Sequence, residues 1–126
     1  MIDHVSLQVT DVARSRTFYQ AVLKPLGLRA AYTDGDAVGF ANGDRAPFWI
    51  GPPVELSPAR EVHIAFTAAD RTVVRGFYEA ALGIKAEILH APRIFPEYHD
   101  DYFACFVRDP DGNNIEAVCH EPQNPG

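Results

Sequence analysis

The strongest constraint on how this 126-residue chain folds is that its second half repeats its first. Residues 4–23, HVSLQVTDVARSRTFYQAVL, align without a gap on residues 63–82, HIAFTAADRTVVRGFYEAAL. The matched pairs include His4 with His63, Asp11 with Asp70 and Leu23 with Leu82. Such a repeat indicates two copies of one supersecondary unit, because a single small unit cannot bury its own apolar face.

Each copy begins with a strand pattern and continues with a helix pattern. Apolar and polar residues first alternate, and the apolar spacing then changes to the helical period. Asp11 and Asp70 stand at this change, where N-cap residues are preferred, and Gly27 and Gly83 stand where each helix must stop. Shorter strands are predicted at 28–32, 37–41 and 47–50 in the first copy, and at 85–89, 102–108 and 114–119 in the second.

The order of these elements predicts an α+β fold of two βαβββ modules. We expect one domain over residues 1–126, with modules at 1–53 and 60–120 joined by a Pro-rich linker. Asn42-Gly43 and Asp111-Gly112 are predicted turns, and the carboxylates of the second turn are expected to form it rather than to catalyse. Each module is too small to cover its own sheet, so the two pack together within one chain or between two chains.

Composition narrows the class of partner. The net charge is −6, and the 17 acidic against 11 basic residues include no Lys/Arg run, which argues against nucleic acid or anionic lipid. No apolar stretch approaches the roughly 20 residues that span a bilayer, and the two cysteines lack a C-x-x-C pattern. We therefore expect a cytoplasmic protein with reduced thiols, a small-molecule substrate and no membrane partner. Because a domain of this size gains stability from pairing, we also expect a homodimer.

Three potential metal ligands occupy the strand face that turns away from the helices. Alternation places His4, His63 and Glu116 opposite the apolar residues that cover each helix side. Two imidazoles and a carboxylate can hold one divalent metal and leave positions open for substrate or dioxygen. Fe, Mn, Zn, Ni and Co all suit this donor set. On a flat, wet sheet the same residues would be ordinary polar surface.

Three segments of the chain resemble the vicinal-oxygen-chelate superfamily. They are 2-IDHVSLQVTD-11, 62-VHIAFTA-68 and 109-DPDGNNIEAV-118, and the resemblance covers nearly the whole chain. The superfamily includes glyoxalase I, extradiol ring-cleaving dioxygenases, fosfomycin-resistance thiol transferases and bleomycin-binding proteins. The resemblance implies curved mixed sheets that form a cup, with the helices outside, and metal ligation by His4, His63 and Glu116.

The resemblance also bears on the type of reaction. Glyoxalase-type members often add a Glu ligand from the last strand of the first module, but 47-PFWI-50 contains no carboxylate. This departure favours a three-ligand site like those of the dioxygenases and fosfomycin enzymes. Phe48 and Trp49 of this strand are expected in the core, with a place in the pocket wall as the alternative.

Residues 97–116 resemble the extradiol dioxygenase signature, in which a His and a Tyr precede an Asp-Pro turn. His99 fits the His place, whereas Phe106 stands at the Tyr place, so that Tyr98 or Tyr102 would have to substitute. His99 and Tyr102 are accordingly the predicted catalytic residues, with His99 as an acid/base or hydrogen-bond donor.

Two functions of different kinds follow from the sequence. The first is a metal-dependent enzyme that acts on a small oxygen-chelating substrate by lyase, isomerase or dioxygenase chemistry. The second is a non-enzymatic protein that binds a bleomycin-type drug. The presence of all three potential ligands favours the enzyme, because a pure binder has no need of them.

Overall fold

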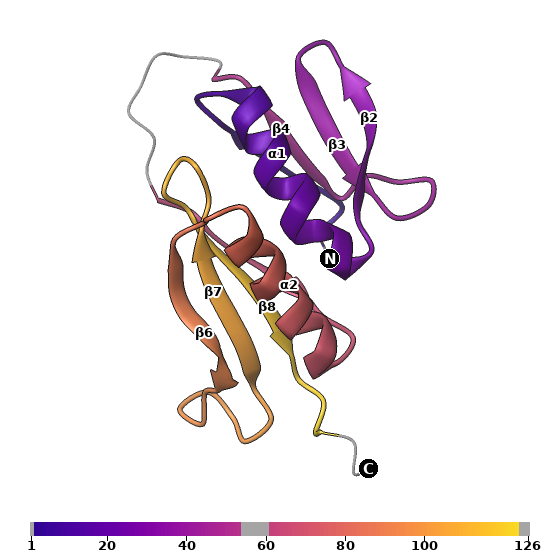
Figure 1. Ribbon diagram of the computed structural model, residues 1–126. Helices are drawn as coiled ribbons and strands as arrows, with labels where there is room; N and C mark the ends of the chain where they lie inside the picture. The colour runs from indigo at the N-terminus through magenta and orange to yellow at the C-terminus, as the bar shows by residue number, and fades with distance from the viewer. Residues whose placement is uncertain (1, 54–60, 124–126) are drawn as a thin grey trace.

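The computed structural model describes residues 2–53 and 61–123, which form two four-stranded mixed sheets, each with one helix (Figure 1). The first half comprises β1 (Val5–Gln8), α1 (Val12–Leu23), the 3-10 turn η1 (Lys24–Leu26), β2 (Arg29–Asp34), β3 (Ala37–Ala41) and β4 (Phe48–Gly51). The second half comprises β5 (His63–Thr67), α2 (Arg71–Gly83), β6 (Ile88–Ile94), β7 (Phe103–Arg108) and β8 (Asn114–Cys119). The predicted α+β class and the βαβββ order of both halves are confirmed.

Each sheet places the last strand of its half beside the first. The strand orders are β1-β4-β3-β2 and β5-β8-β7-β6, with β1 parallel to β4 and β5 parallel to β8. The remaining neighbours are antiparallel, and the described residues form no closed barrel. This topology brings β8, which carries Glu116, alongside β5, which carries His63.

The helices begin where the sequence predicts and end in two different ways. The Asp11 side chain accepts a hydrogen bond from the Arg14 N–H at 3.1 Å, and Asp70 accepts one from the Val73 N–H at 2.9 Å. After α1 and η1 the chain turns at Gly27, with φ 84°, whereas after α2 the left-handed position falls on Lys85, with φ 59°.

The exit from α2 displaces one strand from its predicted position. The sequence predicts a strand at 85–89, but β6 begins only at Ile88 and runs to Ile94, because the chain first needs the left-handed Lys85 to leave the helix. The other strand boundaries lie within two residues of the prediction. No helix in the described ranges is long and apolar enough to cross a bilayer.

One hydrophobic core joins the two halves. The helices α1 and α2 lie on the same side of the sheets and contact each other (Figure 1). Phe48 of β4 and Phe66 of β5 meet with ring centroids 5.3 Å apart, so Phe48 belongs to the core, as expected. Trp49 instead lies on the helix-free face over Gly39, where a Cβ would come within 2.8 Å of the indole. Each sheet therefore has one face that neither α1 nor α2 covers.

A buried hydrogen bond ties the halves together from inside. Tyr19 of α1 is fully buried, and its hydroxyl donates to Asp109 Oδ2 at 2.6 Å across 90 residues of sequence. Nearby, the Thr10 hydroxyl donates to Asp111 Oδ1 at 2.6 Å. Because these bonds link residues of both predicted modules, we propose that 1–53 and 60–120 unfold together as one domain.

The Tyr19 bond predicts a particular dependence of stability on pH. Burial, and then the adjacent Asp109 carboxylate, raise the pKa of Tyr19 above its ordinary range. The folded protein thus holds this proton more tightly than the unfolded chain, so the contribution of Tyr19 is complete below pH ~10 and is lost as pH rises further. Tyr19→Phe should lower the free energy of unfolding at pH 7 by about 1–3 kcal/mol and flatten its decline at alkaline pH.

Urea titrations at pH 7 and at alkaline pH measure both effects. The repeat supplies a matched control in Tyr78, which is partly buried and whose hydroxyl forms no hydrogen bond within the described residues. Tyr78→Phe should change stability by less than about 0.5 kcal/mol at pH 7. Equal effects of the two substitutions would contradict the role assigned to Tyr19.

Candidate metal centre

Glu116 is a buried carboxylate on the sheet face that carries no helix. The neighbouring residues Ile115 and Ala117 point into the core beneath α2, and alternation turns Glu116 the other way. Glu116 is nevertheless only 1% exposed, because His63 contacts one carboxylate oxygen and Tyr102 the other. Its Oε1 lies 3.0 Å from His63 Nε2, and its Oε2 accepts a short hydrogen bond from the Tyr102 hydroxyl.

The strand register holds His63 at this carboxylate. His63 lies opposite Asn114 in the parallel pair β5–β8, two residues from the level of Glu116. Its Nδ1 is 3.2 Å from the Asn114 carbonyl oxygen, and its ring stacks on Phe106 with an interplanar angle of 16°. Phe106, which stands at the Tyr position of the dioxygenase signature, thus packs against the imidazole of His63.

The hydrogen bonds of His63 test whether a metal suits the pair. A carbonyl oxygen can only accept, so Nδ1 must carry a proton in the bond to Asn114. In a neutral imidazole Nε2 then has a bare lone pair directed at the Glu116 carboxylate, 3.0 Å away. Two lone pairs this close require a cation between them, either a proton or a metal. An Nδ1–H bonded to a carbonyl is also the usual support of a metal-binding histidine, so the donor set fits a divalent metal.

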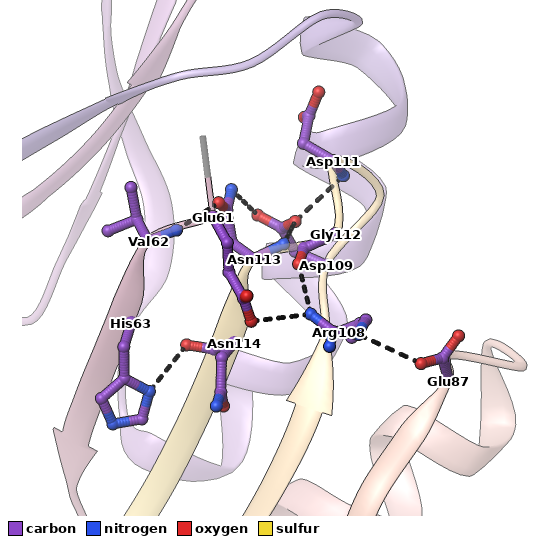
Figure 2. Close-up of polar contacts among 10 residues, drawn as sticks. All are labelled: Glu61, Val62, His63, Glu87, Arg108, Asp109, Asp111, Gly112, Asn113 and Asn114. Carbon is purple, nitrogen blue, oxygen red and sulfur yellow. Dashed lines mark hydrogen bonds and ion pairs between the residues drawn. The ribbon is translucent and has the colours of Figure 1, made fainter. Parts of the chain in front are cut away.

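The turn between β7 and β8 fixes the start of β5 (Figure 2). Asp109 Oδ1 accepts the backbone N–H groups of Asp111 at 2.9 Å and Asn113 at 2.8 Å, and Asp109 Oδ2 accepts from Asn113 Nδ2 at 2.9 Å. Asn113 Oδ1 in turn accepts the Val62 N–H at 2.9 Å, directly before His63. The expectation that the carboxylates form the turn is confirmed for Asp109, whereas the Asp111 carboxylate accepts from Thr10 of the first half.

Arg108 is held at the end of β7 and is not available as a free cation beside Glu116. Its guanidinium pairs with Glu61 at 2.8 Å and Glu87 at 3.2 Å and donates to the Gly112 carbonyl at 2.6 Å (Figure 2). The hydrogen bond to Glu61 raises the pKa of Arg108. Arg93 of β6 stacks over Phe95, with its guanidinium carbon 3.7 Å from the ring centroid.

An apolar cluster on the helix-free face shields the carboxylate from water. Its buried members are Phe95, Ala104, Phe106 and Val118, with Leu89 and Tyr102 packed against them. Burial, and then the bond to Glu116, raise the pKa of Tyr102, so the phenol stays a neutral donor at working pH. Tyr102 therefore contacts a predicted metal ligand directly.

His99, the other predicted catalytic residue, belongs to an exposed pair of imidazoles. Its Nδ1 accepts the Asp101 N–H at 3.1 Å, so its Nε2 carries the proton and donates to His120 Nδ1 at 2.8 Å. The ring centroids of His99 and His120 lie 5.5 and 5.2 Å from that of Tyr102. His120, which directly follows β8, is not among the site residues predicted from the sequence, although its parity with Glu116 indicates the same face.

His4 does not join His63 and Glu116 within one chain. Its side chain is 59% exposed, and its Nδ1 lies 2.7 Å from Asp3 Oδ1. His4 and His63 both line a cavity of about 700 Å³ at the starts of β1 and β5. In residues 2–53 and 61–123, however, no group of three or more His, Cys, Asp or Glu side chains is placed to hold one metal. A single chain thus gathers two of the three predicted ligands.

The chain is similar to known proteins in both sequence and fold. The model of the Glyoxalase/Bleomycin resistance protein/Dioxygenase superfamily matches residues 1–117. A glyoxalase/bleomycin resistance protein from Albidiferax ferrireducens T118 is 25% identical, with a TM-score of 0.80 over 93% of this chain and 97% of that one. No curated protein matches the chain.

Two further solved structures share the fold at lower identity. A lactoylglutathione lyase from Agrobacterium tumefaciens is 21% identical, with a TM-score of 0.70 over 94% of this chain and 92% of that one. The fosfomycin resistance protein FosX from Mesorhizobium loti is also 21% identical, with a TM-score of 0.67 over 94% and 91%. At this identity the two likenesses show the fold alone.

Proposed function

Because the chain belongs to the glyoxalase/bleomycin resistance protein/dioxygenase superfamily, we propose that it is a metal-dependent enzyme acting on a small substrate with two neighbouring oxygens. The observation that carries the proposal is the buried Glu116 carboxylate, with the Nε2 of His63 directed at it from 3.0 Å. A buried carboxylate is costly without a cation, and a neutral His63 directs an imidazole lone pair at this one. A metal ligated by both residues would satisfy the two groups together.

The third ligand of the proposed site is His4 from a second copy of the chain. Within one chain His4 bonds to Asp3 and no described triad forms. The helix-free faces of both sheets carry potential ligands and no covering helix, so a second copy can place its first sheet over this second one. The proposed protein is therefore a homodimer in which each site draws on both subunits.

The bound metal would supply Lewis-acid polarisation of the substrate oxygens. The chain's own residues hold the site in shape. Tyr102 donates a hydrogen bond to Glu116 Oε2 and so fixes the carboxylate, while the Asn114 carbonyl and Phe106 fix the His63 ring. The apolar cluster that includes Phe95 excludes water from one side.

His99 is the proposed acid/base. The proton on His99 Nε2 already lies in a hydrogen bond to His120 Nδ1, so a proton taken up or lost at His99 can be shared with the second imidazole. Both rings are exposed, and this position gives them access to solvent protons. The proposed location is the cytoplasm, which suits two cysteines that are free and buried.

Metal analysis of protein purified without chelator tests the proposal. We expect about one transition metal per chain, and reloading of the chelator-treated protein should restore the same ratio. Oxygen consumption with a catechol after Fe(II) reloading would identify the dioxygenase branch, whereas anaerobic thiol-dependent turnover with Ni(II) or Zn(II) would identify the lyase branch. Protein that stays metal-free and instead binds a bleomycin-type drug would overturn the enzyme proposal.

A further inference from the structure

A second cavity lies where α1 meets the chain that follows α2. Its volume is about 510 Å³, a size typical of metabolite sites. The lining residues are Arg14, Thr17, Phe18, Ile84, Lys85, Ala86, Glu87, Arg108, Asp109, Pro110 and Gly112. Neither His63 nor Glu116 lines it, so this cavity is distinct from the proposed metal centre.

The charges around this cavity favour an anion. Arg14 and Lys85 line it, and neither forms an ion pair with any residue in the described ranges. The acidic lining residues are already engaged: Asp109 accepts from Tyr19 and from the backbone of its own turn, and Glu87 pairs with Arg108. In a chain of net charge −6, two unpaired cations at one cavity are a local exception.

The backbone of Lys85 gives a second, independent reason. Lys85 has φ 59°, the left-handed conformation that favours glycine, and it is the only non-glycine residue with positive φ in the described part of the chain. At the corresponding exit from the first helix, the same task falls to Gly27. A lysine in place of glycine costs stability, and such strain is typical of functional positions.

We propose that this cavity binds a small multivalent oxyanion, a phosphate- or carboxylate-bearing metabolite, between Arg14 and Lys85. The Arg14 guanidinium offers a planar fork for two oxygens, and the Lys85 ammonium in the same lining offers a compact point charge. The anion joins α1 of the first half to the loop after α2 of the second half.

Calorimetric titration of the chelator-treated protein with inorganic pyrophosphate tests the proposal, with citrate as the second arm. Saturable binding of one pyrophosphate per chain is expected, and tighter binding of citrate would identify a polycarboxylate as the ligand class. Arg14→Gln and Lys85→Gly should each weaken binding at least about tenfold. Arg16→Gln, an exposed arginine of the same helix outside the cavity lining, should change it less than about twofold.

Lys85→Gly carries a second readout with the opposite sign. Because glycine relieves the left-handed strain, this variant should raise the thermal midpoint by a few degrees, about 2–5 °C, while it loses the anion. A lower midpoint, no saturable binding by the wild type, or equal weakening by Arg14→Gln and Arg16→Gln would each overturn the proposal. Pyrophosphate should bind the Glu116→Gln variant as it binds the wild type, so failure of the metal proposal leaves this test unaffected.

Discussion

Glu116→Gln is expected to lower the affinity for divalent metal at least about 100-fold while leaving the metal-free protein as stable as the wild type or more so. The substitution keeps the shape of the side chain and its ability to accept a hydrogen bond from Tyr102. It removes the negative charge of a residue that is only 1% exposed. A buried charge costs free energy when no cation accompanies it. The two effects therefore have opposite signs.

Metal titration and urea unfolding of chelator-treated protein measure these two effects. The matched control is Glu79→Gln, which removes the same charge from an exposed position on α2 and should leave both quantities unchanged. A large loss of stability in metal-free Glu116→Gln would instead assign the carboxylate to the structure of the sheet. Unchanged metal affinity would remove it from the proposed ligands.

Mixing a His4→Ala chain with a Glu116→Gln chain is expected to restore metal binding that neither variant has alone. If each site takes His4 from one copy and His63 with Glu116 from the other, every mixed dimer contains one intact site and one site with both defects. Random exchange of equal amounts then recovers about one quarter of the wild-type metal content. If all three ligands came from one chain, every site would carry a defect and nothing would be recovered.

The control mixture combines His63→Ala with Glu116→Gln. Both changes lie on the second sheet, so exchange of subunits cannot bring His63 and Glu116 together in one undamaged copy. No recovery is expected from this mixture. Differently tagged chains report whether mixed dimers have formed, and failure of the first mixture despite such dimers would contradict the shared site.

Much of the fold follows from the repeat and from local rules. Asp11 and Asp70 cap their helices as predicted, because an N-cap depends on neighbours three residues away. The start of β6 could not be predicted in the same way. Its position depends on the left-handed conformation of Lys85. Glycine is the residue usually expected in that conformation after a helix, so the sequence did not indicate Lys85.

In the candidate site, too, the features set by local sequence could be predicted, and those set by distant contacts could not. Strand alternation correctly placed His63 and Glu116 on the helix-free face, and their contact follows from the parallel register of β5 and β8. Alternation gives no distances across the chain, so it could not foresee that Tyr19 reaches Asp109 or that His4 stays apart from His63 and Glu116 within one chain. Those arrangements depend on how the two halves pack.

The place of β8 between β5 and β7 also governs the order in which the protein can assemble during synthesis. The ribosome releases the first half early, whereas β5 must wait for a strand that lies 51 residues further along, as in the bond from Val62 to Asn113. Until then β5 and β7 expose unpaired strand edges, which invite aggregation. We therefore expect a chain truncated before residue 114 to aggregate rather than to fold into a smaller functional protein.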